Sequence, residues 1–216
     1  MERIICLLIG YACGLFQTAY IMGKIYHTDI RKQGSGNLGS TNVMRTLGKK
    51  AGALNLLCDC LKCVAAILIV RALFEDRYAD ILPLLSLYAA AGCILGHNFP
   101  FYLNFKGGKG IAASVGLLAA FDWRLLLICA AVFFALFFTT HYVSLCSISA
   151  YVIAFILMVV FGQRGDYHMD QSHMLELYVV MAFLTVLALF RHKKNIQRLL
   201  DGTESKIYLG KKKKNQ

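Results

Sequence analysis

The residues of this chain whose types and spacing suit chemistry gather in three polar segments. The first segment, 34–45, holds three glycines, two serines and two asparagines within its first nine residues. Such a backbone bends freely and offers many hydrogen-bond donors, and Arg45 adds a permanent cation whose planar fork fits a phosphate. A flexible polar turn between helices has the same composition, so the segment by itself leaves phosphate binding and a plain turn open.

The second segment follows the sequence Gly-His-Asn-Phe-Pro at 96–100 and alternates lysines with glycines. Its central part reads Lys106, Gly107, Gly108, Lys109 and Gly110. An apolar helix is expected to begin directly afterwards at Ile111, and free N–H groups at a helix start attract anions. The pattern is not a Walker A loop, because a glycine rather than Ser or Thr follows the second lysine. The alternative is that the two lysines anchor a helix to lipid headgroups.

The third segment, 191–204, places His192 and Asn195 three residues apart, so that a helix would bring both to one face. An ordinary basic stop signal after a membrane span has a similar composition and is the alternative. The run of lysines at 211–214 is interpreted as part of a basic solvated tail, 211–216, that touches anionic lipid.

Two charged residues, Asp59 and Lys62, lie inside an apolar stretch. Either one alone at the centre of a membrane helix would cost roughly 2.5–3.5 kcal/mol. As a pair on one helix face they indicate a polar cavity, which Ser144 and Ser147 would also line; simple helix packing is the alternative for the two serines. The nearby cysteines at 58, 60 and 63 match no usual zinc spacing, so no metal site is expected.

Apolar stretches separate these segments and must position them. The chain is 58% hydrophobic and 16% charged, and its apolar segments are 3–25, 51–74, 79–96, 110–121, 125–139, 144–162 and 173–190. A straight span needs about 20 residues, so the fourth and fifth segments are short. We therefore expect an all-α, polytopic integral membrane protein with about seven transmembrane helices, or five if 110–139 is a re-entrant hairpin. Residues 1–216 would form a single membrane-embedded domain.

The distribution of lysine and arginine predicts the orientation. Of the 23 basic residues, six lie in 24–50, two in 106–109 and nine in 191–214. Because cytoplasmic loops are enriched in Lys and Arg, these three segments are expected in the cytoplasm, with the N-terminus outside and the C-terminus inside. The net charge of +11 then has a membrane explanation, and no nucleic-acid partner is expected.

Together the three segments resemble the motifs of the PlsY family of acyl-phosphate-dependent glycerol-3-phosphate acyltransferases. The first motif is similar to 34–45, and the second to 96–112, with Gly-His-x-Phe-Pro and Phe-Lys-Gly-Gly-Lys-Gly intact. The third is similar to 192–204, with His-x-x-Asn, Arg-Leu, Gly and Glu in place. The motifs occur in order, and the resemblance covers nearly the whole chain.

The sequence departs from the family pattern at three places. Cys63 stands where the glycine of Asp-x-x-Lys-Gly is usual, which puts close helix packing at this point in doubt. Ser40 replaces a common alanine. Gln17 and Thr18 replace a Ser-Ile-Pro stretch, so the first helix is expected to be less kinked.

The resemblance implies transfer of a fatty acyl group from acyl phosphate to glycerol 3-phosphate, which gives lysophosphatidic acid and inorganic phosphate in phospholipid biosynthesis. It implies a multi-pass enzyme of the bacterial plasma membrane with a cytoplasmic active site, without a cofactor and without an obligate protein partner besides membrane lipid. No histidine has an aspartate five positions later, so the His-x4-Asp chemistry of other acyltransferases is not supported. A transporter of an organic phosphate is the alternative function.

The same resemblance implies the site residues. The catalytic candidates are Ser35, Arg45, His97, His192 and Asn195. The candidates for binding substrate phosphate are Asn37, Thr41, Asn42, Lys62, Lys106, Gly107, Gly108, Lys109, Gly110 and Ser144. Asp59 and Glu204 are expected to be structural. Either a histidine or the donor's own phosphate would accept the hydroxyl proton, and an acyl intermediate on Ser35 is disfavoured because no partner base is marked beside it.

Overall fold

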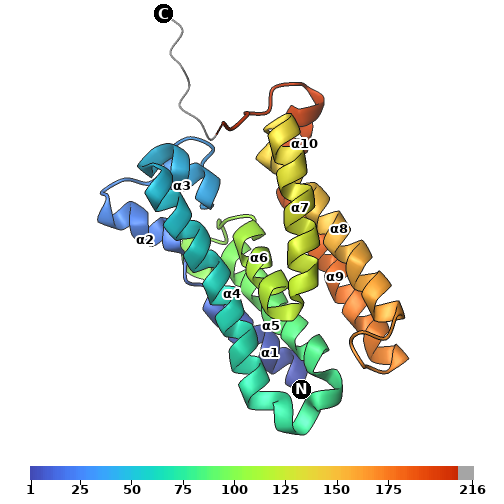
Figure 1. The fold of residues 1–216 in the computed structure, drawn as a ribbon. Helices are drawn as coiled ribbons and strands as arrows, with labels where there is room; N and C mark the ends of the chain where they lie inside the picture. Colours follow the sequence, from blue (N-terminus) through green and yellow to red (C-terminus); the bar gives the residue numbers. More distant parts are fainter. Residues whose placement is uncertain (209–216) are drawn as a thin grey trace, which may run out of the picture.

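The computed structural model describes residues 1–208, which form a bundle of helices with short connections (Figure 1). The α-helices are α1 Glu2–Gly14, α2 Thr18–Ile25, α3 Ser40–Leu47, α4 Lys49–Tyr78, α5 Leu82–Asn98, α6 Ile111–Phe121, α7 Trp123–Thr140, α8 Val143–Gln163, α9 Gln171–Arg191 and α10 Lys193–Leu200. Single turns of 3-10 helix are η1 Ile30–Lys32, η2 Ala79–Ile81 and η3 Phe101–Leu103. The all-α prediction is confirmed over the described residues, whereas the tail predicted for 211–216 lies outside them.

Five helical stretches are long and apolar enough to cross a membrane. They are Glu2–Ile25, Lys49–Leu103, Trp123–Thr140, Val143–Gln163 and Gln171–Arg191. The second stretch contains both α4 and α5, which run in opposite directions in Figure 1, and the apolar α6 has only 11 residues. These helices fit the expected polytopic membrane protein, while the number of crossings, seven or five, stays a prediction.

Small residues lie where the helices pack most closely. A Cβ added at Gly10 or Gly14 of α1 would overlap the backbone of α5. In a membrane, such residues let two helices approach until dispersion contacts form along their backbones. Gly116 of α6 likewise lies against α4, where an added Cβ would overlap the backbone of Cys60 and crowd the side chain of Cys63. The close packing that Cys63 put in doubt is therefore supplied by a glycine of the neighbouring helix.

The first apolar segment is interrupted, so the expectation of a less kinked first helix is wrong. Helix α1 ends at Gly14 and α2 begins at Thr18. Between them Gln17 is buried, and its Nε2 donates to the carbonyl oxygens of Gly14 (3.2 Å), Gly96 (3.2 Å) and His97 (3.0 Å). Backbone freed inside a bundle needs polar partners, and this amide provides them, so the break does not depend on proline.

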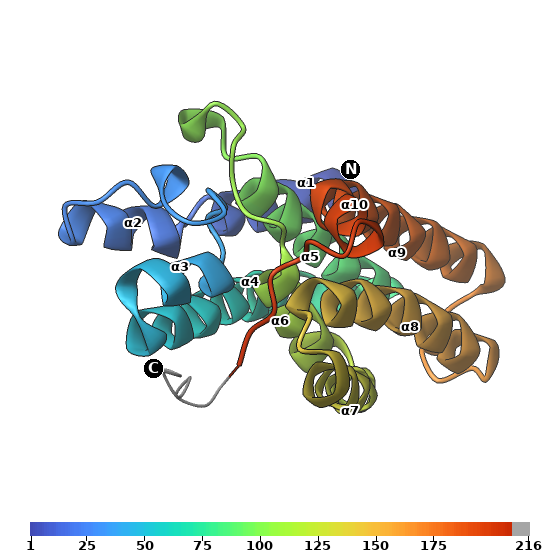
Figure 2. The same cartoon turned by 90° about the horizontal axis from the view of Figure 1, so that it is seen from above.

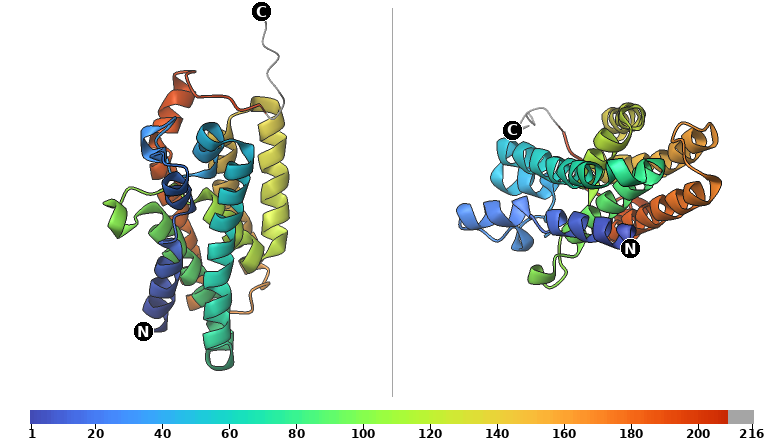
Figure 3. Two further views of the ribbon diagram at one scale, coloured as in Figure 1. Left: turned by 90° about the vertical axis from the view of Figure 1, so that its left-hand side faces the viewer. Right: turned by 90° about the horizontal axis from the view of Figure 1, so that it is seen from below.

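The two ends of the bundle carry different elements. One end, at the top of Figure 1, carries α2, α3 and α10, and Figure 2 looks onto it with the connection 99–110 running between α3 and α10. The other end carries the N-terminus and the α4–α5 and α8–α9 turns, at the bottom of the left view of Figure 3. The three polar segments therefore share one end, here called the site end; the opposite one is the far end.

Two arginines at the far end are bound to carboxylates. Arg3 binds Glu176 through two nitrogens, Nε at 2.6 Å and Nη2 at 2.7 Å, and so ties α1 to α9. Arg124, at the start of α7, binds Asp122 (Nη2 to Oδ2, 2.7 Å) and Asp166 (Nη1 to Oδ2, 3.1 Å). These contacts join the α6–α7 corner to the α8–α9 turn.

Candidate active site

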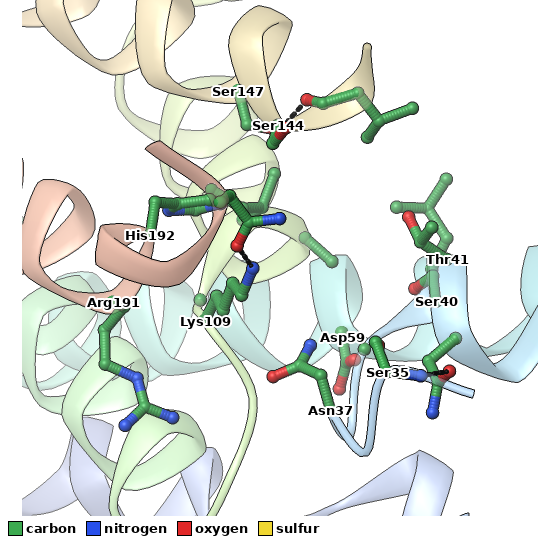
Figure 4. A pocket seen from close by; sticks show the side chains of 18 of the residues that line it. Ser35, Asn37, Ser40, Thr41, Asp59, Lys109, Ser144, Ser147, Arg191 and His192 are labelled. Atoms are coloured by element: carbon green, nitrogen blue, oxygen red, sulfur yellow. Dashed lines mark hydrogen bonds between the residues drawn. The ribbon is translucent and has the colours of Figure 1, made fainter. Parts of the chain in front are cut away.

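The three polar segments line one cavity of about 1670 Å³. All five predicted catalytic residues line it, as do Asp59, Glu204 and every predicted phosphate-binding residue except Lys62 and Gly108. In Figure 4 the side chains of Lys109 and His192 lie across the cavity from that of Ser35. The structure thus brings residues that are more than a hundred positions apart in the sequence to one place.

The loop before α3 is held in shape by one buried amide. Asn42 is 1% exposed, and its Oδ1 accepts a hydrogen bond from the backbone N–H of Ser35 (2.9 Å). Its Nδ2 donates to the carbonyl oxygens of Ile30 (3.2 Å) and Gln33 (3.0 Å). Asn42 was expected to bind phosphate, but its amide is already used to position the loop.

Four polar side chains on this loop and on α3 remain available to a ligand. Ser35, Asn37, Thr41 and Arg45 all line the cavity. None of these side chains forms a hydrogen bond or an ion pair with another residue of the described part, 1–208. Two hydroxyls, an amide and a guanidinium on one wall form a donor-rich surface suited to the oxygens of a phosphate.

A buried charged group lies directly behind the cavity wall. The ammonium of Lys62 contacts Asp59 Oδ1 (2.7 Å), the carbonyl oxygen of Phe16 (2.7 Å) and His97 Nδ1 (2.9 Å). Its three hydrogens therefore have three acceptors, which is what makes a buried ion pair tolerable among apolar helices. Lys62 was expected to bind the donor phosphate, but the structure places it outside the cavity lining, where it holds His97.

The glycine loop is less open than the expected anion nest. The N–H of Gly107 donates to the carbonyl of Asn98 and that of Gly108 to the carbonyl of His97, both at 3.1 Å. Only the next two amides, at 109 and 110, and the first turn of α6 are left without a backbone acceptor among the described residues. Phosphate binding at this loop would therefore rest mainly on its lysines and on the start of α6.

Arg191 closes the glycine loop from the other side. Its Nη2 donates to the carbonyl oxygens of Gly107 (3.1 Å) and Gly108 (2.6 Å), and so fastens the loop to the end of α9. A Cβ at Gly108 would overlap Nε2 of His97, so only glycine allows this close approach. From the sequence, Arg191 counted only as one more positive charge, because nothing in its neighbours along the chain points to a loop 84 positions away.

Lys109 joins the second segment to the third. Its ammonium, labelled in Figure 4, donates to Asn195 Oδ1. Asn195 Nδ2 in turn donates to Glu204 Oε1 at 2.7 Å. Glu204 also accepts from Ser144 Oγ (2.8 Å) and from Arg198 Nε (2.6 Å). The carboxylate of Glu204 therefore connects α8, α10 and, through the amide of Asn195, the glycine loop.

Burial and the surrounding charges act on the titration of this network. Burial lowers the pKa of Lys109 to about 8; Glu204 opposes this shift, while Arg198, Arg191 and Arg45 add to it. Burial acts to raise the pKa of Glu204, but its three hydrogen bonds outweigh that effect and the pKa falls below its ordinary value. Near neutral pH the site thus holds an ionised carboxylate and a lysine that loses its proton slightly above neutrality.

His192 is buried with one ring nitrogen already used. Its Nδ1 lies 2.8 Å from the carbonyl oxygen of Ala188, and a carbonyl can only accept, so Nδ1 carries the hydrogen. Burial, followed by the charge of Lys109, lowers the pKa of His192 to about 4. The ring is therefore neutral at pH 7, and its Nε2 is an acceptor.

Away from its polar mouth the cavity continues along apolar side chains of α6, α7 and α8, which include Leu117, Leu126, Phe133, Phe134 and Ala154. One polar pair lies among them, since the hydroxyls of Ser114 and Tyr151 are hydrogen-bonded to each other. Sequence reasoning missed this pair, because a uniformly apolar helix gives no signal of which face turns inward.

The arrangement suits an amphiphile. A cationic, donor-rich mouth can hold anionic head groups, and the apolar extension can hold a hydrocarbon chain. Within residues 1–208, no group of three His, Cys, Asp or Glu side chains is placed to hold a metal ion. The carboxylates of Asp59 and Glu204 in the lining are bonded to other residues, so the groups left for a ligand are donors, cations and two histidines, which suit binding of anions.

Comparisons with known proteins agree with this chemistry. The sequence profile of a family described as glycerol-3-phosphate acyltransferase matches residues 4–202. A protein of that name from Clostridioides difficile (strain 630) is 43% identical over 212 residues, which cover 97% of each chain. Another, from Lactiplantibacillus plantarum, is 38% identical over 214 residues, which cover 97% of this chain and 94% of the relative.

Two solved structures are also similar to this chain. They are crystal structures of PlsY (YgiH), an integral membrane glycerol 3-phosphate acyltransferase, in a glycerol 3-phosphate form and a lysophosphatidic acid form. The TM-scores are 0.82 and 0.80, at 30% sequence identity, and the match covers 96% of each chain.

Proposed function

Because the chain belongs to the glycerol-3-phosphate acyltransferase family, we propose that it transfers a fatty acyl group from acyl phosphate to glycerol 3-phosphate. The products would be lysophosphatidic acid and inorganic phosphate. The family and the PlsY structures make the protein an acyltransferase of phospholipid synthesis and a multi-pass membrane protein. The acyl-phosphate donor and the two products are the further step of this proposal.

The shape and lining of the cavity support this function most directly. Its mouth gathers Arg45, Lys106 and Lys109 from two separate segments, while its inner part is lined by apolar side chains of α6, α7 and α8. Both proposed substrates carry a phosphate, and one also carries a long hydrocarbon chain. Cations on two walls can bind two phosphates, and the apolar extension can hold one hydrocarbon chain. The site therefore fits the pair of substrates better than it fits a single one of them.

The two phosphates are assigned to the two walls of the mouth. We assign glycerol 3-phosphate to the wall formed by Lys106, Lys109 and the start of α6. The head of acyl phosphate is assigned to the opposite wall, where Arg45 and Ser35 have no partner among the described residues. Lys62 takes no part in either phosphate site, because its three donors are already used.

Direct attack of the glycerol hydroxyl on the acyl carbon is the simplest chemistry for this site. An acyl phosphate is already an activated mixed anhydride, so the protein needs to hold both substrates, orient the hydroxyl and stabilise charge on the carbonyl oxygen. Within residues 1–208, no histidine or carboxylate is bonded to Ser35 Oγ, and an acyl-serine intermediate would need such a base.

The proposed membrane arrangement follows the basic residues. The site end carries most of the lysines and arginines, so we place it in the cytoplasm, with the N-terminus outside and the C-terminus inside. We keep seven crossings as the proposal, in which α6 and α7 both span. Labelling of introduced cysteines in intact cells tests this: position 37 should be protected and position 166 accessible, and the reverse result would overturn it.

An assay of the purified protein tests the function. With palmitoyl phosphate and glycerol 3-phosphate we expect release of inorganic phosphate and equimolar formation of lysophosphatidic acid, and no product from acyl-CoA or acyl carrier protein. An Arg45→Ala variant of the same preparation serves as the control for contaminating activity. Comparable turnover with acyl-CoA as the sole donor would refute the proposed donor.

A further inference from the structure

A second cavity, of about 340 Å³, lies between α2 and the segment that follows it and is here called the α2 pocket. Its lining contains two cations, Lys24 and Arg31, and one carboxylate, Asp29. Both cations lie over the ring of Tyr20, with Lys24 Nζ at 5.6 Å and Arg31 Cζ at 5.8 Å from the ring centroid. One ring therefore gathers two positive charges at a small cavity. The other lining residues are Gly23, His27, Thr28, Ile30 and Leu38.

The cations of the α2 pocket are only partly used by the protein itself. Asp29 binds Arg31 through two nitrogens, Nε at 2.9 Å and Nη2 at 3.0 Å, which leaves Nη1 without a partner within residues 1–208. Lys24 is exposed and forms no hydrogen bond or ion pair with another described residue. The lining thus has one positive charge in excess, and the oxygens of a phosphate can accept from both cations.

The position of the pocket along the chain places it at a membrane surface. The first apolar stretch is Glu2–Ile25, and the α2 pocket starts in its last residues and continues into the polar turn that follows. Seen from above, α2 extends to one side of the bundle (Figure 2). A lysine at the end of an apolar helix keeps its ammonium in the headgroup layer, so Lys24 lies where lipid phosphates are found.

The surface around the α2 pocket is apolar and aromatic. The ring of Tyr20 contacts that of Tyr102, with 6.2 Å between the centroids, so η3 lies next to α2. Aromatic rings concentrate at membrane surfaces, and apolar side chains beside a cation can hold the first carbons of a lipid chain. This surface therefore favours a lipid over a water-soluble anion. Its exposed members on α2, at the end of α2 and on η3 are Ile21, Ile25, Tyr26, Phe101 and Tyr102.

We propose that the α2 pocket binds the phosphate of an anionic membrane phospholipid, with the ammonium of Lys24 and Nη1 of Arg31 as its cations. The lipid is bound there and not converted. The inference does not depend on the proposed acyl donor, because it uses only the pocket, its charges and its place at a membrane surface.

The α2 pocket and the active site share a wall. Asp29 and Arg31 line both cavities. Between these two residues Ile30 is buried, and its carbonyl oxygen accepts from Asn42 Nδ2 at 3.2 Å. The Oδ1 of the same amide accepts from the backbone N–H of Ser35 at 2.9 Å. A headgroup that steadies η1 therefore also steadies the loop of the first motif, and anionic lipid should raise kcat/KM.

Native mass spectrometry of the full-length protein in detergent tests the binding. The protein is titrated with phosphatidylglycerol, which is anionic, or with phosphatidylcholine, which is zwitterionic. We expect wild type to retain phosphatidylglycerol in preference, and Lys24→Gln to retain it about fivefold more weakly, the effect of one charge near a lipid surface. Because Lys24 does not line the active site, lipid held there is unaffected by this change.

The matched control is Lys50→Gln, which removes an exposed lysine outside both cavities. It should retain phosphatidylglycerol as wild type does. Equal weakening in the two variants, or no weakening in Lys24→Gln, would overturn the proposal.

Two further measurements separate a lipid from a free anion. Phe101→Ser removes apolar surface from η3 but no charge, and it should also weaken retention of phosphatidylglycerol. Inorganic phosphate or glycerol 3-phosphate at millimolar concentration should not displace the lipid molecule whose retention depends on Lys24. Displacement by either anion, or full retention by Phe101→Ser, would show that the pocket takes water-soluble phosphates and that the lipid assignment is wrong.

Activity in nanodiscs tests the shared wall. Wild-type kcat/KM should rise when phosphatidylglycerol replaces phosphatidylcholine, and Lys24→Gln should lose this rise while it keeps the rate measured in phosphatidylcholine. Lys50→Gln should respond as wild type does. If Lys24→Gln also responded as wild type does, the bound lipid would not act on the active site. If wild type transferred no acyl group in either lipid, the proposed function would be wrong, while mass spectrometry still decides the lipid site.

Discussion

Two arginines of the far end and two cations of the site end are used in opposite ways. At the far end Arg3 and Arg124 are each bound to carboxylates, with nitrogen–oxygen distances of 2.6 and 2.7 Å. At the site end Arg45 and Lys106 have no partner of opposite charge within residues 1–208. The first two therefore hold helices together, as Arg198 does with Glu204 at the site end, whereas Arg45 and Lys106 remain available for anions.

This difference shows what makes a cationic cluster a binding site. An arginine with its carboxylate partner in place has little left to offer a phosphate, whereas one without a partner repels its neighbours until an anion arrives. Lys109 shows such repulsion between cations, since the charges of Arg198, Arg191 and Arg45 add to burial in lowering its pKa. The site end should therefore be sensitive in activity, and the far end only in stability.

The largest expected effect is that of Arg45→Ala. Because Arg45 is a free cation on the cavity wall, its loss should lower kcat/KM about 10²–10³-fold and leave the melting temperature unchanged. Steady-state kinetics and a thermal melt of the same samples measure both quantities. Arg124→Ala is the matched control, expected to lower the melting temperature and keep kcat/KM. If Arg45→Ala lowered only the melting temperature and Arg124→Ala lowered only kcat/KM, the proposed difference between the two ends would be wrong.

A smaller effect is expected for Gly108→Ala. The new Cβ would overlap His97 Nε2, so the ring must shift, and a displacement of about 1 Å can lower the rate about 10²-fold. Initial rates with each substrate varied show whether kcat falls, as expected. At the far end, Gly162→Ala meets the flexible ends of Met174 and Tyr178 and should change stability alone. If Gly108→Ala and Gly162→Ala had the same kcat, the close contact between Gly108 and His97 would not matter for the rate.

The pH dependence gives a more moderate effect. Burial lowers the pKa of Lys109 to about 8, so its charge is present below pH 8 and lost as the pH rises through that value. Above pH 8, kcat/KM for glycerol 3-phosphate should fall about tenfold per pH unit. Lys109→Arg stays charged and should flatten this limb of the profile. A wild-type kcat/KM that stays constant up to pH 9.5 would show that the charge of Lys109 does not take part in binding glycerol 3-phosphate.

The smallest effect is expected at the far end for Arg3→Met. The Arg3–Glu176 pair is partly exposed, so its loss should reduce the free energy of unfolding by at most about 1 kcal/mol and leave kcat/KM unchanged. Glu176→Gln should behave in the same way. A loss of activity in either variant would show that the far end communicates with the site.

Much of the helix pattern could be predicted from the sequence, because each apolar segment has to satisfy its own backbone. The segments 110–121 and 144–162 correspond closely to α6 and α8. The break at Gln17 could not be predicted, because it depends on carbonyl oxygens of α5 that are distant in sequence. The local sequence pattern thus predicts which residues are helical. It does not predict where contacts with a neighbouring helix stabilise a break.

The members of the candidate site could be named from its motifs, but not their individual contacts. Lys62 and Asn42 were both assigned to phosphate on the basis of the family resemblance, yet both are used in holding other parts of the site. Two of the three partners of Lys62, Phe16 and His97, are 46 and 35 positions away, and the partners of Asn42 lie in the preceding segment 30–35. Such contacts arise from tertiary packing, which residue type and spacing do not encode.

The position of Glu204 has a consequence for how the protein is made. The carboxylate that connects Ser144, Asn195 and Arg198 lies close to the C-terminal end of the chain, beyond every membrane helix. During synthesis, all the long helices have been translated before this residue is added. A chain that stops before Glu204 would therefore be inserted without the contacts that hold its third motif in place. Full activity then requires translation through Glu204 as well as correct insertion.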